Sequence, residues 1–291
     1  MTAKRFPIPV YGSDHADQEE ARGLDIPDTV ASFRMPEYSG NADKSSAAAC
    51  CRFFREITHL MGDGTSHLCK SFSALTSEDV AFIRDMLGEG EVSIRVQTKG
   101  QIYDEIRIRE SRFVGVWSVR FLKLGRPVAE HIEVAPIPDC VRDALNAIRQ
   151  KELFAVAVPK EAMNSPSVLT ELKVRLKNFD GNTTGAPIIL SSLPMTPTDQ
   201  TVIDAAVGHG PVRIVSEGMG TCCIESCGVR NLWKIQYFGS APAKRMTLNM
   251  LSVCDIPEEA LASPEDLEDS KKRLTEVIRW IEESWQLTEP R

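Results

Sequence analysis

The chain has 291 residues, of which 42% are hydrophobic and 26% charged, and its formal net charge at pH 7 is −7. These values are typical of a soluble globular protein, and a length near 300 residues predicts about two domains. The negative charge argues against nucleic acid as the main partner, and the sequence lacks the roughly 18 consecutive apolar residues of a membrane span. Eight cysteines without a regular framework indicate reduced thiols in a cytoplasm rather than a disulfide scaffold.

We expect residues 1–44 to form an extended, locally acidic N-terminal arm, because prolines and glycines interrupt every longer periodicity. Such an arm is either a solvated leader or a segment that becomes ordered on a partner. A helix then begins at Ser45 or Ser46 and ends near Met61. A short strand follows around Leu68–Phe72.

The residue pattern in the rest of the first half predicts a helix, then a meander of strands, then a closing helix. Thr76 and Asp79 have the spacing of a capping box at the start of the helix. Alternation of apolar and polar residues predicts the meander, with strands around Val92–Val96, Ile102–Ile108, Trp117–Phe121 and Ile132–Val134. Asp139 is the expected N-cap of the closing helix.

The second half predicts the same order of elements. Leu153–Val158 is expected to be a linking strand, and Ser165 to be the N-cap of a helix with proline in its first turn. Residues 188–190 form a strand, a Pro194–Pro197 turn leads into the next helix, and a second meander follows. Ser263 then begins the last helix, with Asp266 completing a capping box.

Landmarks in the two halves recur in the same order, which predicts an internal duplication. Gly88-Glu89-Gly90 recurs as Gly208-His209-Gly210, an offset of 208 − 88 = 120 residues, and Trp117 recurs as Trp233, an offset of 116. We therefore predict an α+β fold of two tandem, structurally similar repeats, each a mainly antiparallel meander flanked by helices. The expected boundaries are residues 1–44 for the arm, 45–152 for the first repeat and 153–291 for the second.

The two Gly-x-Gly motifs are not interpreted as phosphate-binding loops. A dinucleotide-binding fingerprint needs a strand, then the glycines, then a helix whose N-terminus faces the phosphates. Here each motif follows a helix and precedes a strand, so an anion would meet the negative end of the helix dipole. The first glycine of each motif is expected to cap the helix in a left-handed conformation.

Cys222, Cys223 and Cys227 form the densest group of possible metal ligands in the sequence. Cys222 and Cys223 should point to opposite faces of a strand, and no nearby residue completes the roughly four ligands of a closed zinc or iron–sulfur site. We interpret them mainly as structural thiols, with transient iron–sulfur contact or thiol redox chemistry as alternatives. No resident cofactor is predicted.

Five further residues are candidates for contact with a partner protein. Glu110 and Glu225 follow each Gly-x-Gly motif at similar places, and we interpret them as solvent-facing strand residues rather than general acids. Trp117 and Trp233 belong either to the core or to an exposed interface, and Tyr237 lies on the same strand as Trp233. Because no catalytic motif is present, the sequence favours a binding or assembly role over an enzyme.

The chain resembles the HupH/HyaF family of accessory proteins for uptake nickel–iron hydrogenases. The motifs that carry this resemblance are Leu24-Asp25-Ile26-Pro27, Ala31-Ser32-Phe33-Arg34-Met35-Pro36, Met163-Asn164-Ser165-Pro166, Gly88-Glu89-Gly90-Glu91-Val92, Trp233-Lys234-Ile235-Gln236-Tyr237-Phe238 and Pro264-Glu265-Asp266-Leu267-Glu268-Asp269-Ser270. The resemblance implies a cytoplasmic chaperone or scaffold for the precursor of the hydrogenase small subunit, which carries the iron–sulfur clusters. It also implies a role when oxygen is present and a thioredoxin-like accessory protein as a further partner. The alternative is a metal- or cluster-handling protein that uses the three cysteines.

Overall fold

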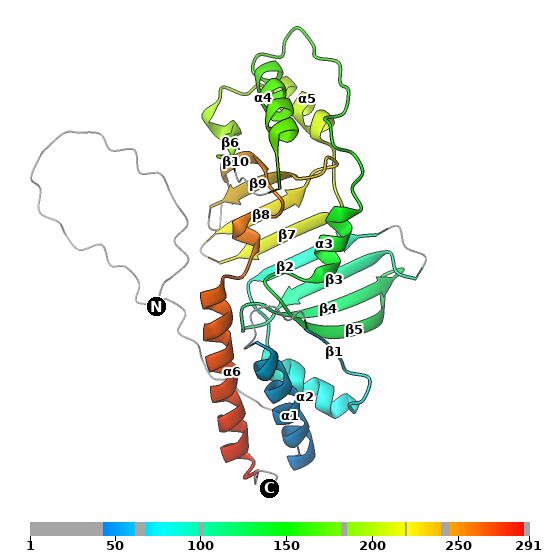
Figure 1. The fold of residues 1–291 in the computed structure, drawn as a ribbon, viewed down its shortest axis with the longest axis vertical. Coiled ribbons are helices and arrows are strands. Elements are labelled where there is room, and N and C mark those ends of the chain that lie inside the picture. Colours follow the sequence, from blue (N-terminus) through cyan, green and yellow to red (C-terminus); the bar gives the residue numbers. More distant parts are fainter. Residues whose placement is uncertain are drawn as a thin grey trace, which may run out of the picture.

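A computed structural model describes residues 43–61, 68–98, 102–181, 185–218, 220–239 and 245–287 (Figure 1). Almost all of the expected arm, residues 1–44, lies outside these described residues. Within them the fold is α+β, as predicted, with six α-helices packed on one sheet of ten strands. None of the helices in the described ranges has both the length and the apolar character that crossing a bilayer requires.

The sheet is antiparallel throughout, with the strand order β1-β5-β4-β3-β2-β7-β8-β9-β10-β6. Each predicted meander forms one half of the sheet, and the two meanders meet where β2 pairs with β7. The strands are β1 (Leu68–Ser71), β2 (Val92–Gln97), β3 (Glu105–Glu110), β4 (Val116–Lys123), β5 (Arg126–Val134), β6 (Ile188–Ile189), β7 (Val212–Glu217), β8 (Thr221–Ser226), β9 (Leu232–Phe238) and β10 (Met246–Val253).

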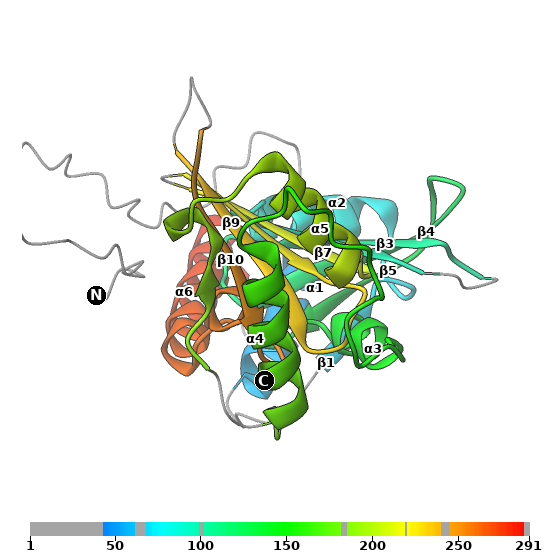
Figure 2. The same ribbon diagram turned by 90° about the horizontal axis from the view of Figure 1, so that it is seen from above.

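The helices cover the two faces of the sheet differently (Figures 1 and 2). They are α1 (Lys44–Leu60), α2 (Ser77–Leu87), α3 (Asp139–Asn146), α4 (Ser165–Asn178), α5 (Pro197–Val207) and α6 (Pro264–Ser284). The face that carries Val116 and Leu232, called the helical face below, packs against α1, α2 and α6 at one end and against α4 and α5 at the other. The opposite face, called the α3 face, carries the central apolar cluster with Trp117 and Trp233 and packs against α3.

Capping boxes begin three helices, two of which, α2 and α6, the sequence predicts. They join Thr76 to Asp79 at α2, Thr196 to Asp199 at α5, and Ser263 to Asp266 at α6. In each box the N-cap hydroxyl accepts a backbone N–H of the first turn, and the carboxylate accepts the N–H of the N-cap residue. The helix donors that lack partners inside the helix are thereby satisfied at the point where it enters the core.

Three predicted N-caps are displaced by one to three residues. Asp43, rather than Ser45 or Ser46, caps α1, and its carboxylate accepts the Ser46 N–H at 2.8 Å. Pro138 precedes α3 and Asn164 precedes α4, so the polar residues predicted as caps are instead the first residues of those helices. Helix boundaries shift by a residue with small changes in dihedral angles, which sequence patterns do not resolve.

The Gly-x-Gly motifs end helices, as predicted. Gly88 and Gly208 follow α2 and α5, and their N–H groups donate to the carbonyl oxygens of Arg84 and Asp204. Their φ angles are 58° and 60°, but ψ is −169° and −174°, so the backbone is not in the expected left-handed helical region. This combination of angles is open essentially to glycine alone, which explains the residue type at both positions.

The predicted strand at Leu153–Val158 is wrong, because this segment joins no sheet. The Phe154 N–H instead donates to the carbonyl oxygen of Ala206 near the end of α5, at 2.8 Å. The alternating apolar residues of the segment therefore pack along a helix end. Leu153 and Val156 contact the apolar cluster formed with α4 and α5.

Matching contacts in the two halves support the predicted tandem repeats, which stay a prediction together with the boundaries 45–152 and 153–291. The Trp117 Nε1–H donates to the carbonyl oxygen of Ala135 at 2.9 Å, and the Trp233 Nε1–H donates to that of Asp255 at 3.0 Å. The last helix departs from a simple division in two. Although it follows the second meander, α6 packs on α1 of the first half.

Candidate interaction surface

Trp117 and Trp233 lie in the core of the α3 face, each with 1% of its surface exposed. Each indole N–H already donates to a backbone carbonyl oxygen. The residues packed over the α3 face shield both rings from a partner. Of the two interpretations of these residues, the structure therefore supports the core and not an interface anchor. Tyr237 is half-buried on the same face, beside Cys222.

Glu110 is buried rather than solvent-facing, which corrects the prediction for this residue. Its carboxylate accepts the Gly115 N–H at 3.1 Å. Glu110 lies opposite Trp117, whereas Ser226 lies opposite Trp233, so Ser226 rather than Glu225 occupies the corresponding place. The sequence match of Glu110-Ser111 with Glu225-Ser226 is therefore out of register by one residue, and a shift of one residue in a strand exchanges the two faces.

The three clustered cysteines do not form a ligand set. Cys222 faces the central cluster and Cys227 the cluster beneath α4 and α5, and Cys223 points to the opposite face from Cys222, as predicted. All three are buried. Burial raises the pKa of Cys222 to about 11 and that of Cys227 to about 12, so both are protonated thiols at neutral pH.

The sequence did not predict a row of exposed arginines that crosses the centre of the sheet. Arg120, Arg107, Arg95 and Arg213 lie directly opposite one another on β4, β3, β2 and β7, and we call these four residues the arginine row. Their side chains are exposed by 49%, 53%, 60% and 59%. Because cross-strand partners share a face, all four stand on the helical face, between the two groups of helices.

Like charges directly opposite one another destabilise a sheet, so the arginine row requires compensation. Acidic side chains provide part of it, through Glu105 at 3.0 Å from both Arg95 and Arg107, Glu130 at 3.1 Å from Arg120, and Glu225 at 2.5 Å from Arg213. The hydrogen bonds from Arg107 lower the pKa of Glu105. Four guanidinium groups against three carboxylates leave a positive surface in a chain whose net charge is −7.

The row ends against a helix at each side. Glu130 on β5 pairs with Arg84 of α2, and Lys234 on β9, which lies opposite Glu225, pairs with Asp204 of α5 at 2.6 Å. The exposed guanidinium groups therefore lie on a strip of sheet bounded by α2 and α5. Arginine suits such a surface because it keeps its charge at every accessible pH and binds carboxylates through two parallel hydrogen bonds.

A weak signal for this row is present in the sequence. Each of the four arginines has an apolar residue on both sides, as in Ile94-Arg95-Val96 and Val212-Arg213-Ile214. Period-two alternation places such an arginine on the solvent face. It does not give the register between strands, and only the register turns four separate arginines into one row.

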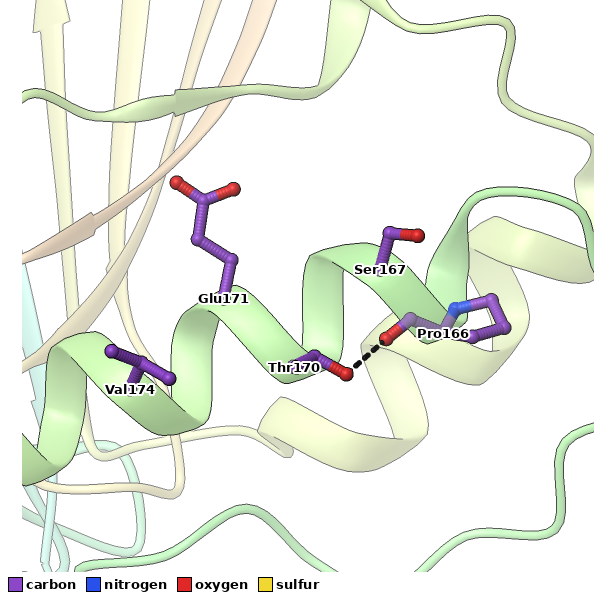
Figure 3. A pocket seen from close by; sticks show the side chains of 5 residues that line it. All are labelled: Pro166, Ser167, Thr170, Glu171 and Val174. Atoms are coloured by element: carbon purple, nitrogen blue, oxygen red, sulfur yellow. Dashed lines mark hydrogen bonds between the residues drawn. The ribbon is translucent and has the colours of Figure 1, made fainter.

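Pro166, Ser167, Thr170, Glu171 and Val174 line a shallow depression of about 500 Å³ along α4 (Figure 3). The Thr170 hydroxyl donates to the Pro166 carbonyl oxygen at 2.8 Å, and Glu171 pairs with Arg175. A small-molecule site is normally a concave pocket with a few converging polar groups. This depression is an open helix face on which Thr170 and Glu171 are already paired within α4, so it does not resemble a substrate pocket.

Together these features define an α+β protein with a row of exposed arginines across one face of its sheet. The chain belongs to the HupH hydrogenase expression protein family, which confirms the resemblance found in the sequence. The family model described as the C-terminal conserved region of HupH hydrogenase expression protein matches residues 62–152 and 162–281. One match falls within each predicted repeat.

Relatives from three bacteria resemble the chain over most of its length. It is 33% identical over 283 residues to the hydrogenase expression/formation protein HoxQ of Cupriavidus necator, covering 95% of this chain and 98% of that protein. Identity to the hydrogenase expression/formation protein HupQ of Azotobacter chroococcum is 36% over 281 residues, covering 94% and 97%. Identity to the hydrogenase-1 operon protein HyaF of Escherichia coli is 31% over 212 residues, covering 72% of each protein.

Proposed function

We propose that this chain is a non-enzymatic accessory protein of nickel–iron hydrogenase maturation, and that it binds the precursor of the hydrogenase small subunit. Membership of the HupH family and the names of the relatives support the pathway. In this role the protein acts in the cytoplasm and holds the precursor while its iron–sulfur clusters are built or protected from oxygen. A thioredoxin-like accessory protein joins the same complex.

The arginine row is the surface that receives the precursor, and it binds an acidic segment of that protein. The observation that supports this assignment is the alignment of four exposed arginines across four central strands. Arginine is enriched among the residues that dominate binding energy at protein interfaces. The cost of placing like charges side by side is offset when carboxylates of a partner lie between them.

Co-purification of the full chain with the small-subunit precursor tests the proposal. The variant R95Q/R107Q/R213Q removes three positive charges from the row, and K271Q/K272Q/R279Q removes three from the exposed side of α6 as a matched control. We expect the row variant to weaken binding by at least about tenfold, because arginine is enriched among the hot-spot residues whose truncation costs about 2 kcal/mol or more, and about 1.4 kcal/mol is tenfold. The control variant should bind within about twofold of the native chain, as expected for charges outside the interface.

The outcomes separate the partner from the surface. Failure of the native chain to bind the precursor, at low or high oxygen tension, would refute the proposed partner. Equal binding by the native chain and the row variant would support the proposed partner but refute the arginine row as the surface that binds it. Binding through the row should also weaken with added salt, because exposed charges are screened over about 8 Å at physiological ionic strength.

The alternative, a cluster-handling protein that uses Cys222, Cys223 and Cys227, receives no support from the geometry. Cys222 is buried on the α3 face and Cys223 and Cys227 on the helical face, and the three thiols do not come within reach of one ion. Anaerobic purification followed by metal analysis tests this alternative directly. Iron that is bound in the native chain and lost in C222A would favour it over a purely protein-binding role.

A further inference from the structure

Cys69, His131 and Glu133 come together on the α3 face near one edge of the sheet, far in sequence from the cysteines considered above. Cys69 on β1 lies directly opposite Glu133 on β5, and His131 lies two residues before Glu133 on the same strand. Cross-strand partners and residues two apart share a face. The sheet therefore directs a thiol, an imidazole and a carboxylate to one point.

The distances within this trio are those of ligands around one small cation. The Cys69 Sγ lies 3.6 Å from the His131 Nε2, and that nitrogen lies 3.4 Å from the Glu133 Oε2. Tetrahedral Zn²⁺ with bonds of about 2.3 Å to sulfur and about 2.0–2.2 Å to nitrogen and oxygen separates such atoms by about 3.6 and 3.4 Å. The imidazole–carboxylate distance also exceeds the usual range of an N–H···O hydrogen bond, about 2.7–3.2 Å.

The surroundings of Glu133 provide a second, independent observation. Its side chain is only 2% exposed, and its Oε1 accepts the Asp139 N–H at the start of α3 at 2.6 Å. Its ion-pair partner is His131, which is a cation only when protonated. A buried carboxylate that stays ionised is paired with a positive charge or coordinates a metal. A divalent ion at the Oε2 would supply it, while the α3 N–H fixes the carboxylate from the other side, as outer hydrogen bonds do in metal sites.

We propose that Cys69, His131 and Glu133 bind a divalent transition-metal ion of the Zn²⁺ class. Three protein ligands of mixed sulfur, nitrogen and oxygen type leave a fourth coordination position open. Cys69 is exposed, so the ion can enter and leave from solvent. Among the described residues, this trio is the one group of three such ligand atoms that lie within 4.8 Å of one another. The site is separate from the arginine row, which stands on the opposite face of the sheet.

Titration of the metal-free full chain with Co²⁺ tests the proposal, because a cobalt–thiolate bond gives a charge-transfer absorption band. We expect the band to saturate at one Co²⁺ per chain and to disappear when Zn²⁺ is added. C69S should abolish the band, and H131Q should weaken binding by more than the roughly 10–100-fold that loss of an outer partner costs. C140S is the matched control, because Cys140 is the single cysteine of α3 and lies beside Glu133 without belonging to the trio.

A measurement on the native chain avoids dependence on the folding of any variant. Zn²⁺ should slow the alkylation of Cys69 by iodoacetamide and leave the rate at Cys140 unchanged. The proposal is overturned if equimolar Co²⁺ gives no thiolate band, if the band survives in C69S, or if C140S removes it equally. Zinc that fails to protect Cys69 in the native chain would also overturn it, and would indicate a histidine–carboxylate pair beside an ordinary thiol.

Discussion

Ile94 lies directly opposite Ile214 where the two meanders meet, and each residue is 120 positions from the other in the chain. At the same offset of 120, Val92 corresponds to Val212 and Val96 to Ser216. Each of these residues pairs with the counterpart of the other, because Val96 pairs with Val212 and Val92 pairs with Ser216. A pairing of this kind has local two-fold symmetry about Ile94 and Ile214. We infer that the central pair joins two copies of one folding unit into a continuous sheet, which leaves no edge strand at the junction.

The first prediction concerns this central pair. Both isoleucines are buried, with 3% and 1% of their surface exposed. Ile94→Ala and Ile214→Ala should each lower the free energy of unfolding by about 2–5 kcal/mol, the cost of a cavity in a packed core. Urea denaturation measures the change. The exposed Val128→Ala provides a control that should stay within about 0.5 kcal/mol.

The symmetry adds a sharper expectation. Because the two isoleucines occupy corresponding places, their substitutions should cost the same within about 1 kcal/mol, less than the spread among unrelated core sites. A loss at one position and none at the other would contradict the inferred repeat. The loss of unfolding free energy in the double variant should differ from the sum of the two single losses, because residues in contact are energetically coupled.

The second prediction concerns the second glycine of each Gly-x-Gly motif. A Cβ atom added to Gly90 would lie 2.3 Å from the carbonyl oxygen of Ser111, and one added to Gly210 would lie 2.4 Å from that of Cys227. Both obstacles are backbone atoms, which cannot rotate away. Gly90→Ala and Gly210→Ala should therefore each destabilise the fold by about 1–3 kcal/mol or more.

Gly185→Ala is the matched control for these two substitutions, because the nearest atom to its added Cβ lies 3.9 Å away. Thermal unfolding should show a lower midpoint for the two motif variants and an unchanged or higher one for the control. Equal midpoints for all three variants would mean that the strands shift freely at these positions. The Gly-x-Gly spacing would then need an explanation other than close backbone approach.

The elements were predictable where local chemistry alone decides them. Capping boxes such as Thr76–Asp79 depend on contacts within one turn, and strand alternation such as Ile94–Val96 depends on burial of one face. The packing of α6 on α1 was not predictable, because it joins residues 227 positions apart, as in the Arg55–Glu282 ion pair. No periodicity within either helix indicates its partner.

The candidate surface depended on register, which the sequence does not give. The arginines of the row occupy ordinary solvent-facing positions, and only the pairing of Arg95 with both Arg107 and Arg213 aligns them. A one-residue error in matching the halves likewise placed Glu110 on the wrong face. The trio at Cys69 depends on a contact between residues 62 positions apart, and no short spacing of ligand residues in the sequence indicates it.

The third prediction concerns pH and the start of α4. The Asp199 carboxylate is buried, and one of its oxygens accepts the backbone N–H groups of Met163, Asn164 and Ser165 at 2.9–3.0 Å. Burial alone would raise the pKa of Asp199, but hydrogen bonds from Ser165 and Thr196 outweigh it and hold the pKa well below its usual value. The ionised side chain thus fastens α4 to α5.

A carboxyl group whose pKa is lowered on folding stabilises the native state above its unfolded pKa, and this stabilisation is lost as pH falls through the folded pKa. Asp199→Asn presents an amide N–H₂ group to these donors and should lower stability at about pH 7, with the deficit narrowing below about pH 3.9. Urea midpoints across pH measure this difference, and the exposed Asp143→Asn provides the control. A deficit that stays constant down to the lowest accessible pH would show that shape rather than charge is responsible.

The fourth prediction concerns the order in which thiols react with iodoacetamide in the native, metal-free chain. The reactive species is the thiolate, and burial raises the pKa of Cys222 and Cys227 while excluding the reagent. Cys69 is exposed and should be labelled first. Cys222 and Cys227 should react at least roughly 10³-fold more slowly, because they become accessible only through opening of the sheet or global unfolding. Mass spectrometry of the alkylated peptides measures the order.

Rapid labelling of Cys222 in the folded chain would show that β8 opens readily. Thiol or cluster chemistry at Cys222, Cys223 and Cys227 would then regain support against a purely protein-binding role.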